Sequence, residues 1–171
     1  MSKVIVFCGL SGTGKTTLSE LVSHELDIFC LHKDAMKERL YDSLSGATIE
    51  DSRRIGKAVT ETVQVLAEDA IRNGVDIMIE SPFNHQDNVD RFRQWAEKYD
   101  IDLAVIVCEV AEEDRQRRFG TRVRHPGHHD KERALHHDDF DYSQMPGRKL
   151  FVDTSVSQEE SVQKILDFVR S

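Results

Sequence analysis

The chain has 171 residues, 39% hydrophobic and 32% charged, with a formal net charge of −8 at pH 7. This length and mixture suit one globular domain with a sizeable core, and we expect residues 1–171 to form it. The negative balance argues against a role on long nucleic acid, which a basic domain would favour. No apolar run is long enough for a secretory signal or a membrane span. The three cysteines, Cys8, Cys30 and Cys108, lie inside apolar runs and are expected to be reduced thiols, which favours a cytoplasmic protein without a membrane partner.

Five short apolar runs predict β-strands. Four are clear, at residues 4–8, 76–80, 103–110 and 149–153, and a fifth at 27–32 is weaker. The runs are nearly continuous rather than alternating, as is typical of strands covered on both faces. Amphipathic segments separate them, so the order along the chain predicts an α/β fold with a parallel sheet and right-handed crossovers.

Three segments between and after these runs show clear helical periodicity. The longest ends at Asn73–Gly74, and its apolar residues are Ile55, Val59, Val63, Leu66 and Ala70. The next carries Val89, Phe92, Trp95, Ala96 and Tyr99. The last opens with Ser157 and Glu160 at capping-box spacing and continues with Val162, Ile165, Leu166 and Val169.

The segment GLSGTGKT, residues 9–16, fits the phosphate-binding pattern G-x-x-x-x-G-K-[ST] between a strand and a helical segment. Glycines let backbone N–H groups curl around phosphate oxygens, and the following helix N-terminus adds partial positive charge. We expect Lys15 to reach the β- and γ-phosphates of ATP and the Thr16 hydroxyl to bind Mg²⁺. The alternative is a glycine-rich turn without a ligand. The predicted ATP-binding residues of this loop are Gly9, Ser11, Gly12, Thr13, Gly14, Lys15, Thr16 and Thr17.

Acidic residues follow two of the other strands. Asp34 stands at a strand-to-helix junction, where a carboxylate can take a proton from an attacking hydroxyl or bind Mg²⁺ through water. Capping of the helix is a compatible alternative. Glu80 ends a strand where a Walker-B-type Asp usually stands, so it is expected near Mg²⁺ or substrate, or else as a helix cap or a partner of an arginine. The predicted Mg²⁺ site is therefore Thr16, Asp34 and Glu80.

The chain resembles small P-loop kinases. The resemblance rests on the phosphate-binding loop together with the segments KDAMKE, IESPF and RRFGTRVRHPGHHD. This group includes adenylate kinase, gluconate kinase, adenylylsulfate kinase, chloramphenicol phosphotransferase, zeta-toxin-like enzymes and ATP-binding AAA-domain kinases of uncharacterised substrate. The resemblance implies a three-layer P-loop NTPase fold with a parallel five-stranded sheet in the order 2-3-1-4-5. It also implies a helical, arginine-rich lid over about residues 115–135. Adenylylsulfate kinase carries D-G-D-x-x-R after its second strand, which HKDAMK lacks, so that identity is not expected.

The lid of such kinases follows the fourth strand, where this chain reads AEEDRQRRFGTRVR. Arg118 and Arg122 have the R-x-x-x-R spacing of that lid. The resemblance implies that Arg118 packs near the adenine and that Arg122 reaches the phosphate being transferred. Arg124 is a further candidate for contact with substrate. Guanidinium groups suit these roles because their planar set of N–H donors can bind two phosphate oxygens at once. The alternative is a solvated basic helix face.

The segment HPGHHD contains groups that can bind a metal ion: His125, His128, His129 and Asp130. Their spacing matches no tight ligand set, and zinc-bearing lids of adenylate kinases use mostly cysteine. We therefore expect a turn at Pro126–Gly127, with histidines that cap helices or touch substrate. The residues HHDD at 136–139 are expected to form an exposed polar helix end.

Together these features predict an ATP- and Mg²⁺-dependent phosphotransferase that acts on a hydroxyl of a small molecule. The predicted catalytic residues are Lys15, Asp34 as general base, Arg118 and Arg122. The predicted substrate residues are Lys37, Arg39, Glu80 and Arg124. The substrate is expected between the helix after Asp34, the 48–72 helix and the segment after Glu80. Other cations of that region are Arg53, Arg54 and Lys57, although several of these side chains must simply face water.

Two alternatives belong to other functional classes. One is a kinase or repair enzyme for nucleic-acid ends, against which the acidic balance and the lack of an aromatic stacking platform argue. The other is a nucleotide-binding switch or toxin without a metabolic substrate, which would not need an arginine-rich lid. The sequence predicts no oligomeric state.

Overall fold

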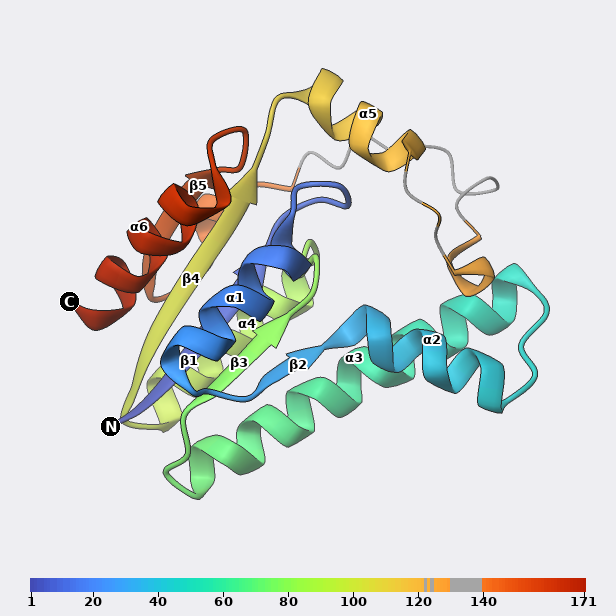
Figure 1. Ribbon diagram of the computed structural model, residues 1–171. Helices are drawn as coiled ribbons and strands as arrows, with labels where there is room; N and C mark the ends of the chain where they lie inside the picture. Colours follow the sequence, from blue (N-terminus) through green and yellow to red (C-terminus); the bar gives the residue numbers. More distant parts are fainter. Residues whose placement is uncertain (122, 124, 130–139) are drawn as a thin grey trace.

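A five-stranded parallel sheet in the order β2-β3-β1-β4-β5 forms the centre of the protein (Figure 1). The computed structural model describes residues 1–121, 123, 125–129 and 140–171. The strands are β1 (Ser2–Cys8), β2 (Cys30–His32), β3 (Ile77–Glu80), β4 (Ile101–Glu109) and β5 (Arg148–Asp153). The expected strands, their direction and their order are confirmed. The weakest sequence pattern corresponds to the shortest strand, β2.

Helices cover both faces of this sheet (Figure 1). They are α1 (Lys15–Leu26), α2 (Lys33–Ser43), α3 (Ile49–Arg72), α4 (Gln86–Lys98), α5 (Glu112–Thr121) and α6 (Gln158–Arg170). Two short 3₁₀ helices, η1 (Pro126–His128) and η2 (Tyr142–Gln144), follow α5. Buried residues of α1 and α6 share one core cluster, and those of α3 and α4 share the other. The expected three-layer fold is confirmed, and every helix in the described ranges is too short or too polar to span a bilayer.

The central strand β1 explains the continuous apolar runs in the sequence. Val4, Val6 and Cys8 face the cluster with α3 and α4, whereas Ile5 and Phe7 face the cluster with α1 and α6. Because successive side chains of a strand point to opposite faces, a strand covered on both sides needs an apolar residue at every position. The three cysteines are free thiols, as expected.

The buried stripe of α3 differs from the predicted one at its C-terminal end. Ile55, Val59 and Val63 are buried as expected, but the stripe continues through Ala67 and Ile71. Leu66, assigned to this stripe from the sequence, is 44% exposed. A stripe at every fourth residue winds slowly around a helix of 3.6 residues per turn, so the contact face drifts along this long helix.

Side-chain caps fix the start of two helices. Thr48 and Asp51 form a reciprocal capping box at α3, with each side chain accepting from the backbone N–H of the other. Ser157 is the N-cap of α6 and accepts from the Glu160 N–H, as its spacing predicts. Such caps satisfy N–H groups that have no partner inside the helix.

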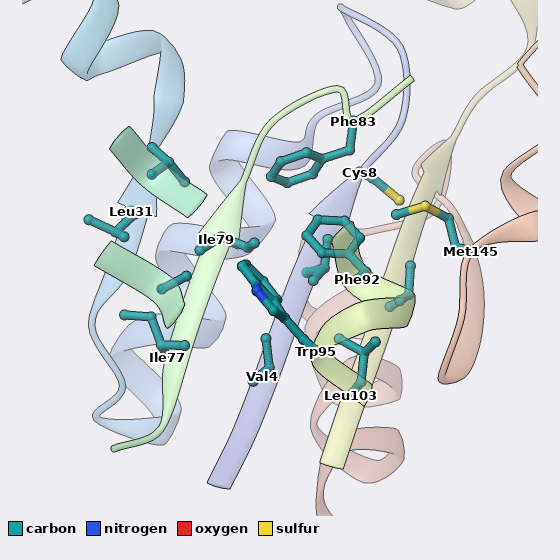
Figure 2. Close-up of a cluster of buried hydrophobic side chains, with 14 of the residues drawn as sticks. Val4, Cys8, Leu31, Ile77, Ile79, Phe83, Phe92, Trp95, Leu103 and Met145 are labelled. Atoms are coloured by element: carbon teal, nitrogen blue, oxygen red, sulfur yellow. The ribbon is translucent and has the colours of Figure 1, made fainter. Parts of the chain in front are cut away.

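An aromatic cluster joins α4 to the segment after β3 (Figure 2). The ring of Phe92 lies edge-on to Phe83, with centroids 5.1 Å apart, and 5.3 Å from the Trp95 ring. Phe83 has a φ of 46°, in the left-handed region that a bulky side chain rarely adopts. Burial of its ring against Phe92 holds this backbone conformation and thereby shapes the segment at the carboxyl end of the sheet.

We expect Phe92→Ala to lower the free energy of unfolding by about 3–5 kcal/mol, because Phe92 is fully buried and leaves a cavity. For a domain of this size the melting temperature should fall by about 6–20 °C, measured by calorimetry. Glu97→Ala, an exposed change on the same helix, should shift it by no more than about 2 °C. If Phe92→Ala lowered the melting temperature no more than Glu97→Ala, the aromatic cluster would not stabilise the fold.

Candidate active site

The phosphate-binding loop between β1 and α1 depends on glycine backbone conformations. Gly9, Gly12 and Gly14 have φ values of 129°, 90° and 85°. A Cβ at Gly9 would lie 2.3 Å from the Cys108 carbonyl oxygen, which no side chain allows. The loop therefore has its shape because β1 ends tightly against β4 and the chain then turns back over the sheet.

Lys15 begins α1 and is held inside this loop. Its side chain is 6% exposed, and its Nζ donates to the Leu10 carbonyl at 2.8 Å. The Thr13 hydroxyl donates to the same carbonyl at 2.9 Å. The ammonium group thus lies at the centre of a loop whose backbone already has the curvature that a phosphate requires.

A cleft of about 390 Å³ brings most predicted nucleotide and catalytic residues together. Its lining residues from the phosphate-binding loop and α1 are Ser11, Gly12, Gly14, Lys15, Thr16, Thr17 and Glu20. Asp34, Glu80, Arg118 and Phe119 complete it. Gly9 and Thr13 line a neighbouring cleft, with residues after β4, instead.

The predicted Mg²⁺ ligands meet in this cleft. The Thr16 hydroxyl lies 3.5 Å from Glu80 Oε2 and donates toward it, and Asp34 lines the same space. Hydroxyl and carboxylate oxygens are the donors that Mg²⁺ prefers, and Mg²⁺ usually keeps several waters beside one or two carboxylates. The three side chains therefore fit a magnesium ion bound together with phosphates.

His32 is a neighbour of this site that the sequence did not identify. It pairs with Glu80 across β2 and β3, and its Nδ1 lies 3.6 Å from Glu80 Oε2. The Cys30 and Glu80 side chains raise the pKa of His32 to about 10, against the effect of burial. The Glu80 Oε2 that accepts from Thr16 therefore also lies close to an imidazole whose protonated form is favoured.

Asp34 lies in the first turn of α2 rather than at its N-cap, which is His32. The alternative role of Asp34 as the helix cap is therefore wrong, although an acid in the first turn still complements the helix dipole. Its Oδ1 accepts from Lys33 Nζ at 3.0 Å, and its side chain is 37% exposed. The carboxylate thus borders the phosphate cleft and is partly exposed.

Two arginines of α5 contact the opposite side of this site. Arg118 donates to the Thr154 hydroxyl at 2.9 Å and to the Thr154 carbonyl at 2.8 Å. Arg115, which the sequence did not single out, is 5% exposed and donates to the Ser11 carbonyl at 3.2 Å, while Glu112 holds its other nitrogens. The base of α5 is therefore packed against the phosphate-binding loop. The predicted residues Arg122 and Arg124 lie outside the described residues.

A second cleft of about 680 Å³, called the acceptor cleft below, lies where the substrate is predicted. From α2 and α3 it is lined by Lys33, Lys37, Ser52, Arg53, Gly56, Lys57, Thr60, Glu61 and Gln64. The segment after β3 and the start of α4 contribute Ser81, Pro82, Phe83, Asn84, His85, Asp87, Asn88 and Arg91. Of the predicted substrate residues, the structure places Lys37 here and Glu80 in the phosphate cleft. Arg39 is exposed and lines neither cleft.

The three histidines of HPGHHD contact α2. The His125 Nε2 lies 3.1 Å from Asp42, the His128 Nε2 lies 2.8 Å from Glu38, and the His129 Nε2 lies 2.9 Å from the Tyr41 hydroxyl. His125 also caps η1 by accepting from the Gly127 N–H, in agreement with the expected cap and turn. Within the described part of the chain, no group of three or more His, Cys, Asp or Glu side chains could hold a metal ion. Asp130 and the HHDD segment lie outside the described residues.

Comparisons with known proteins identify a family and several similar structures. The sequence model of the AAA domain family AAA_33 matches residues 4–142. A candidate kinase from Chloroflexus aurantiacus J-10-fl is 27% identical, with a TM-score of 0.83 and coverage of 97% of both chains. A sugar kinase from Janibacter is 18% identical, with a TM-score of 0.65 and coverage of 99% of this chain and 95% of that chain. The APS kinase CysC of Mycobacterium tuberculosis, in complex with AMPPNP and APS, is 20% identical, with a TM-score of 0.64 and coverage of 99% and 98%.

The two relatives at 18% and 20% identity establish the fold. A search of curated protein sequences finds no significant match. The family match covers most of the chain, including the phosphate-binding loop, both acidic positions and α5. The chain belongs to the AAA domain family AAA_33 and has the fold of the P-loop kinases.

Proposed function

We propose that this protein transfers the γ-phosphoryl group of ATP to a hydroxyl of a small molecule bound in the acceptor cleft. One observation carries the proposal: adjacent residues at the start of α2 line the phosphate cleft and the acceptor cleft. Asp34 lines the first cleft, and its neighbour Lys33 lines the second. A nucleophile bound in the acceptor cleft would therefore approach a phosphate bound in the other cleft near the Asp34 carboxylate.

The phosphate-binding loop supplies the positioning. Its backbone N–H groups and the N-terminus of α1 hold the phosphates, and Lys15 exchanges its bond to Leu10 for phosphate oxygens. Thr16 and Glu80 provide oxygen donors beside the β- and γ-phosphates. Magnesium-bound ATP supplies the phosphoryl group and neutralises part of its charge when it is bound there.

Asp34 acts as the general base in this proposal. As the acceptor oxygen forms its bond to the γ-phosphorus, its proton passes to the Asp34 carboxylate, and the bond to ADP breaks. The carboxylate is 37% exposed and lines the phosphate cleft next to Lys33 of the acceptor cleft, within reach of an acceptor hydroxyl. The Arg118 guanidinium lines the phosphate cleft opposite Asp34 and stabilises negative charge on the phosphates.

Relatives of known activity support the class of reaction. The APS kinase structure contains AMPPNP and APS, and another neighbour of this fold is a gluconokinase from Sinorhizobium meliloti. Both names describe phosphoryl transfer to a small molecule. The cytoplasm, where ATP and Mg²⁺ are abundant, is the proposed location.

We expect Lys15→Ala to leave the protein folded but to remove most of the stabilisation that Mg²⁺-ATP provides. At a ligand concentration about 100 times its Kd, binding adds about 2.7 kcal/mol to the wild type, which raises its melting temperature by about 5–10 °C. Thermal melts with and without Mg²⁺-ATP measure this gain. Lys164→Ala, an exposed lysine change on α6, should keep the full gain. An equal gain in Lys15→Ala would contradict the nucleotide site.

We expect Asp34→Asn to lower turnover about 10²-fold or more with an accepted substrate, since an amide cannot take the proton. The affinity for ATP should change little, because the size of the side chain is kept. Steady-state kinetics and ATP-induced melting shifts separate the two effects. Asp69→Asn on the exposed side of α3 is the matched control and should be neutral. If turnover of Asp34→Asn stays near wild type while that of Glu80→Gln falls, the base is Glu80.

A further inference from the structure

The acceptor cleft gathers positive charge in a protein that is negative overall. Five of its lining side chains are cationic: Lys33, Lys37, Arg53, Lys57 and Arg91. Glu61 and Asp87 are the acidic ones. The whole chain has 31 acidic against 23 basic side chains, so a lining of average composition would be negative. A cleft with the opposite sign concentrates anions and excludes cations.

Two of these cations lie on successive turns of α3 without a strong partner. Among the described residues, Arg53 makes no ion pair and no hydrogen bond. Lys57 has an exposed partner, Glu61, at 3.9 Å, a distance at which an exposed pair contributes little. Because residues four apart share a helix face, Arg53 and Lys57 repel each other. An anion between them would remove this repulsion.

The remaining cations of the cleft are engaged elsewhere. Lys33 pairs with Asp34 at 3.0 Å, and the buried Lys37 donates to the Ser52 hydroxyl at 2.8 Å. Arg91 lies 3.9 Å from Glu68, as far as Lys57 from Glu61, but Glu68 is only 24% exposed against 64% for Glu61, and no second lysine or arginine of the lining comes from α4. Within the described residues, Arg53 and Lys57 are therefore the cations best placed to bind a ligand.

Gly56 lies on the same helix between these two cations and also lines the cleft. Glycine is a poor helix former, and α3 is 24 residues long, so its presence in this helix needs a reason. Packing does not supply one, since a Cβ at Gly56 would meet Lys37 Cε at 3.5 Å, an ordinary contact. The position that a Cβ would take lies 3.5 Å from Lys37 Cε and 3.9 Å from Lys37 Nζ, so the glycine leaves room between the α3 backbone and Lys37 at the lining of the cleft.

We infer that the acceptor is a small alcohol that also carries an oxyanion, such as a phosphate, sulfate or carboxylate group. The oxyanion binds over Gly56 between Arg53 and Lys57. The planar guanidinium of Arg53 grips two of its oxygens, and the Lys57 ammonium supplies a second charge. The inference rests on the proposed function for the role of the hydroxyl, which must reach from the acceptor cleft past Lys33 to Asp34 in the phosphate cleft.

Matched acceptors that differ in charge test the inference. The panel is glycerol with glycerate and glycerol 3-phosphate, glucose with gluconate and glucose 6-phosphate, and adenosine with AMP. ADP formation is measured for the wild type and for the double variant Arg53→Ala/Lys57→Ala. At least one anionic member should exceed its neutral partner in kcat/KM by about tenfold or more, and the double variant should lose that advantage through KM.

Arg54→Ala is the matched control, because Arg54 is 76% exposed, pairs with Asp51 and does not line the cleft. It should retain the wild-type preference for anionic acceptors. If neutral alcohols are phosphorylated as well as anionic ones and the double variant matches the wild type, the inference is overturned, although the protein is still a phosphotransferase.

A binding measurement separates failure of the inference from failure of the proposed function. With Mg²⁺-ADP filling the phosphate cleft, the same compounds are added in thermal melts. A rise in melting temperature caused by anionic members in the wild type and Arg54→Ala, but absent from the double variant, supports the anion site even if no phosphate is transferred. Absence of both phosphorylation and a melting shift with every anionic compound overturns the inference.

Gly56→Ala tests where the oxyanion lies. Without ligand, this variant should melt about 2–4 °C higher than the wild type, because alanine favours the helix and its Cβ fits beside Lys37. The KM for the anionic acceptor should nevertheless rise by about tenfold, while the stabilisation by Mg²⁺-ATP stays unchanged. A more stable variant with an unchanged KM would show that the oxyanion does not lie over Gly56.

Discussion

The close contact between Gly9 and the end of β4 determines where chemistry can take place in this protein. A Cβ at Gly9 would lie 2.3 Å from the Cys108 carbonyl, so the chain leaves β1 in a conformation that only glycine adopts there. The loop then lies over the carboxyl end of the sheet, between the segments that follow β3 and β4. Because β1 and β3 are paired so that Phe7 faces Glu80, the last residue of β3 lies beside the phosphate-binding loop. The pairing of β2 with β3 brings His32, and two residues later Asp34, to the same edge.

The wall of the phosphate cleft that α5 forms depends on the same phosphate-binding loop. A Cβ at Gly12 would lie 3.0 Å from the Arg115 carbonyl oxygen, so the loop and the base of α5 pack backbone against backbone. Arg115 adds a hydrogen bond to Ser11, and Arg118, one turn later, is bonded to Thr154 after β5. The helix that carries the arginines is thus positioned by the loop and by the end of β5, which explains why R-x-x-x-R spacing alone misses the structural role of Arg115.

The sequence predicts the sheet and the nucleotide site well because both depend on local rules. Doubly covered strands need unbroken apolar runs, and the phosphate-binding loop needs glycines, Lys15 and Thr16 at fixed spacing. The acceptor cleft follows partly from topology, since α2, α3 and the segment after β3 must meet beside β2 and β3. The sequence does not reveal which cation lines the acceptor cleft, because Lys37 and Arg39 differ by only two positions on α2. The packing of α2 on α3 buries Lys37 and leaves Arg39 exposed, and the sequence of α2 alone contains no signal for that packing.

The same packing also fixes the positions of residues 125–129 in the segment HPGHHD. A buried ammonium group needs polar partners, and Lys37 donates to Ser52, whose hydroxyl donates to the Gly127 carbonyl at 2.6 Å. Gly127 must be glycine, because a Cβ there would lie 2.8 Å from the Tyr41 ring.

The histidines on either side of Gly127 complete the contact. His125 accepts from the Gly127 N–H through Nδ1, so its Nε2 bears the hydrogen that faces Asp42. His128 and His129 each have a separate partner on α2, Glu38 and Tyr41. Imidazoles that bind a metal ion converge on one point, whereas these three diverge onto successive positions of one helix. Residues 125–129 therefore join the region after α5 to α2 and, through the bond between Ser52 and Gly127, to the lining of the acceptor cleft.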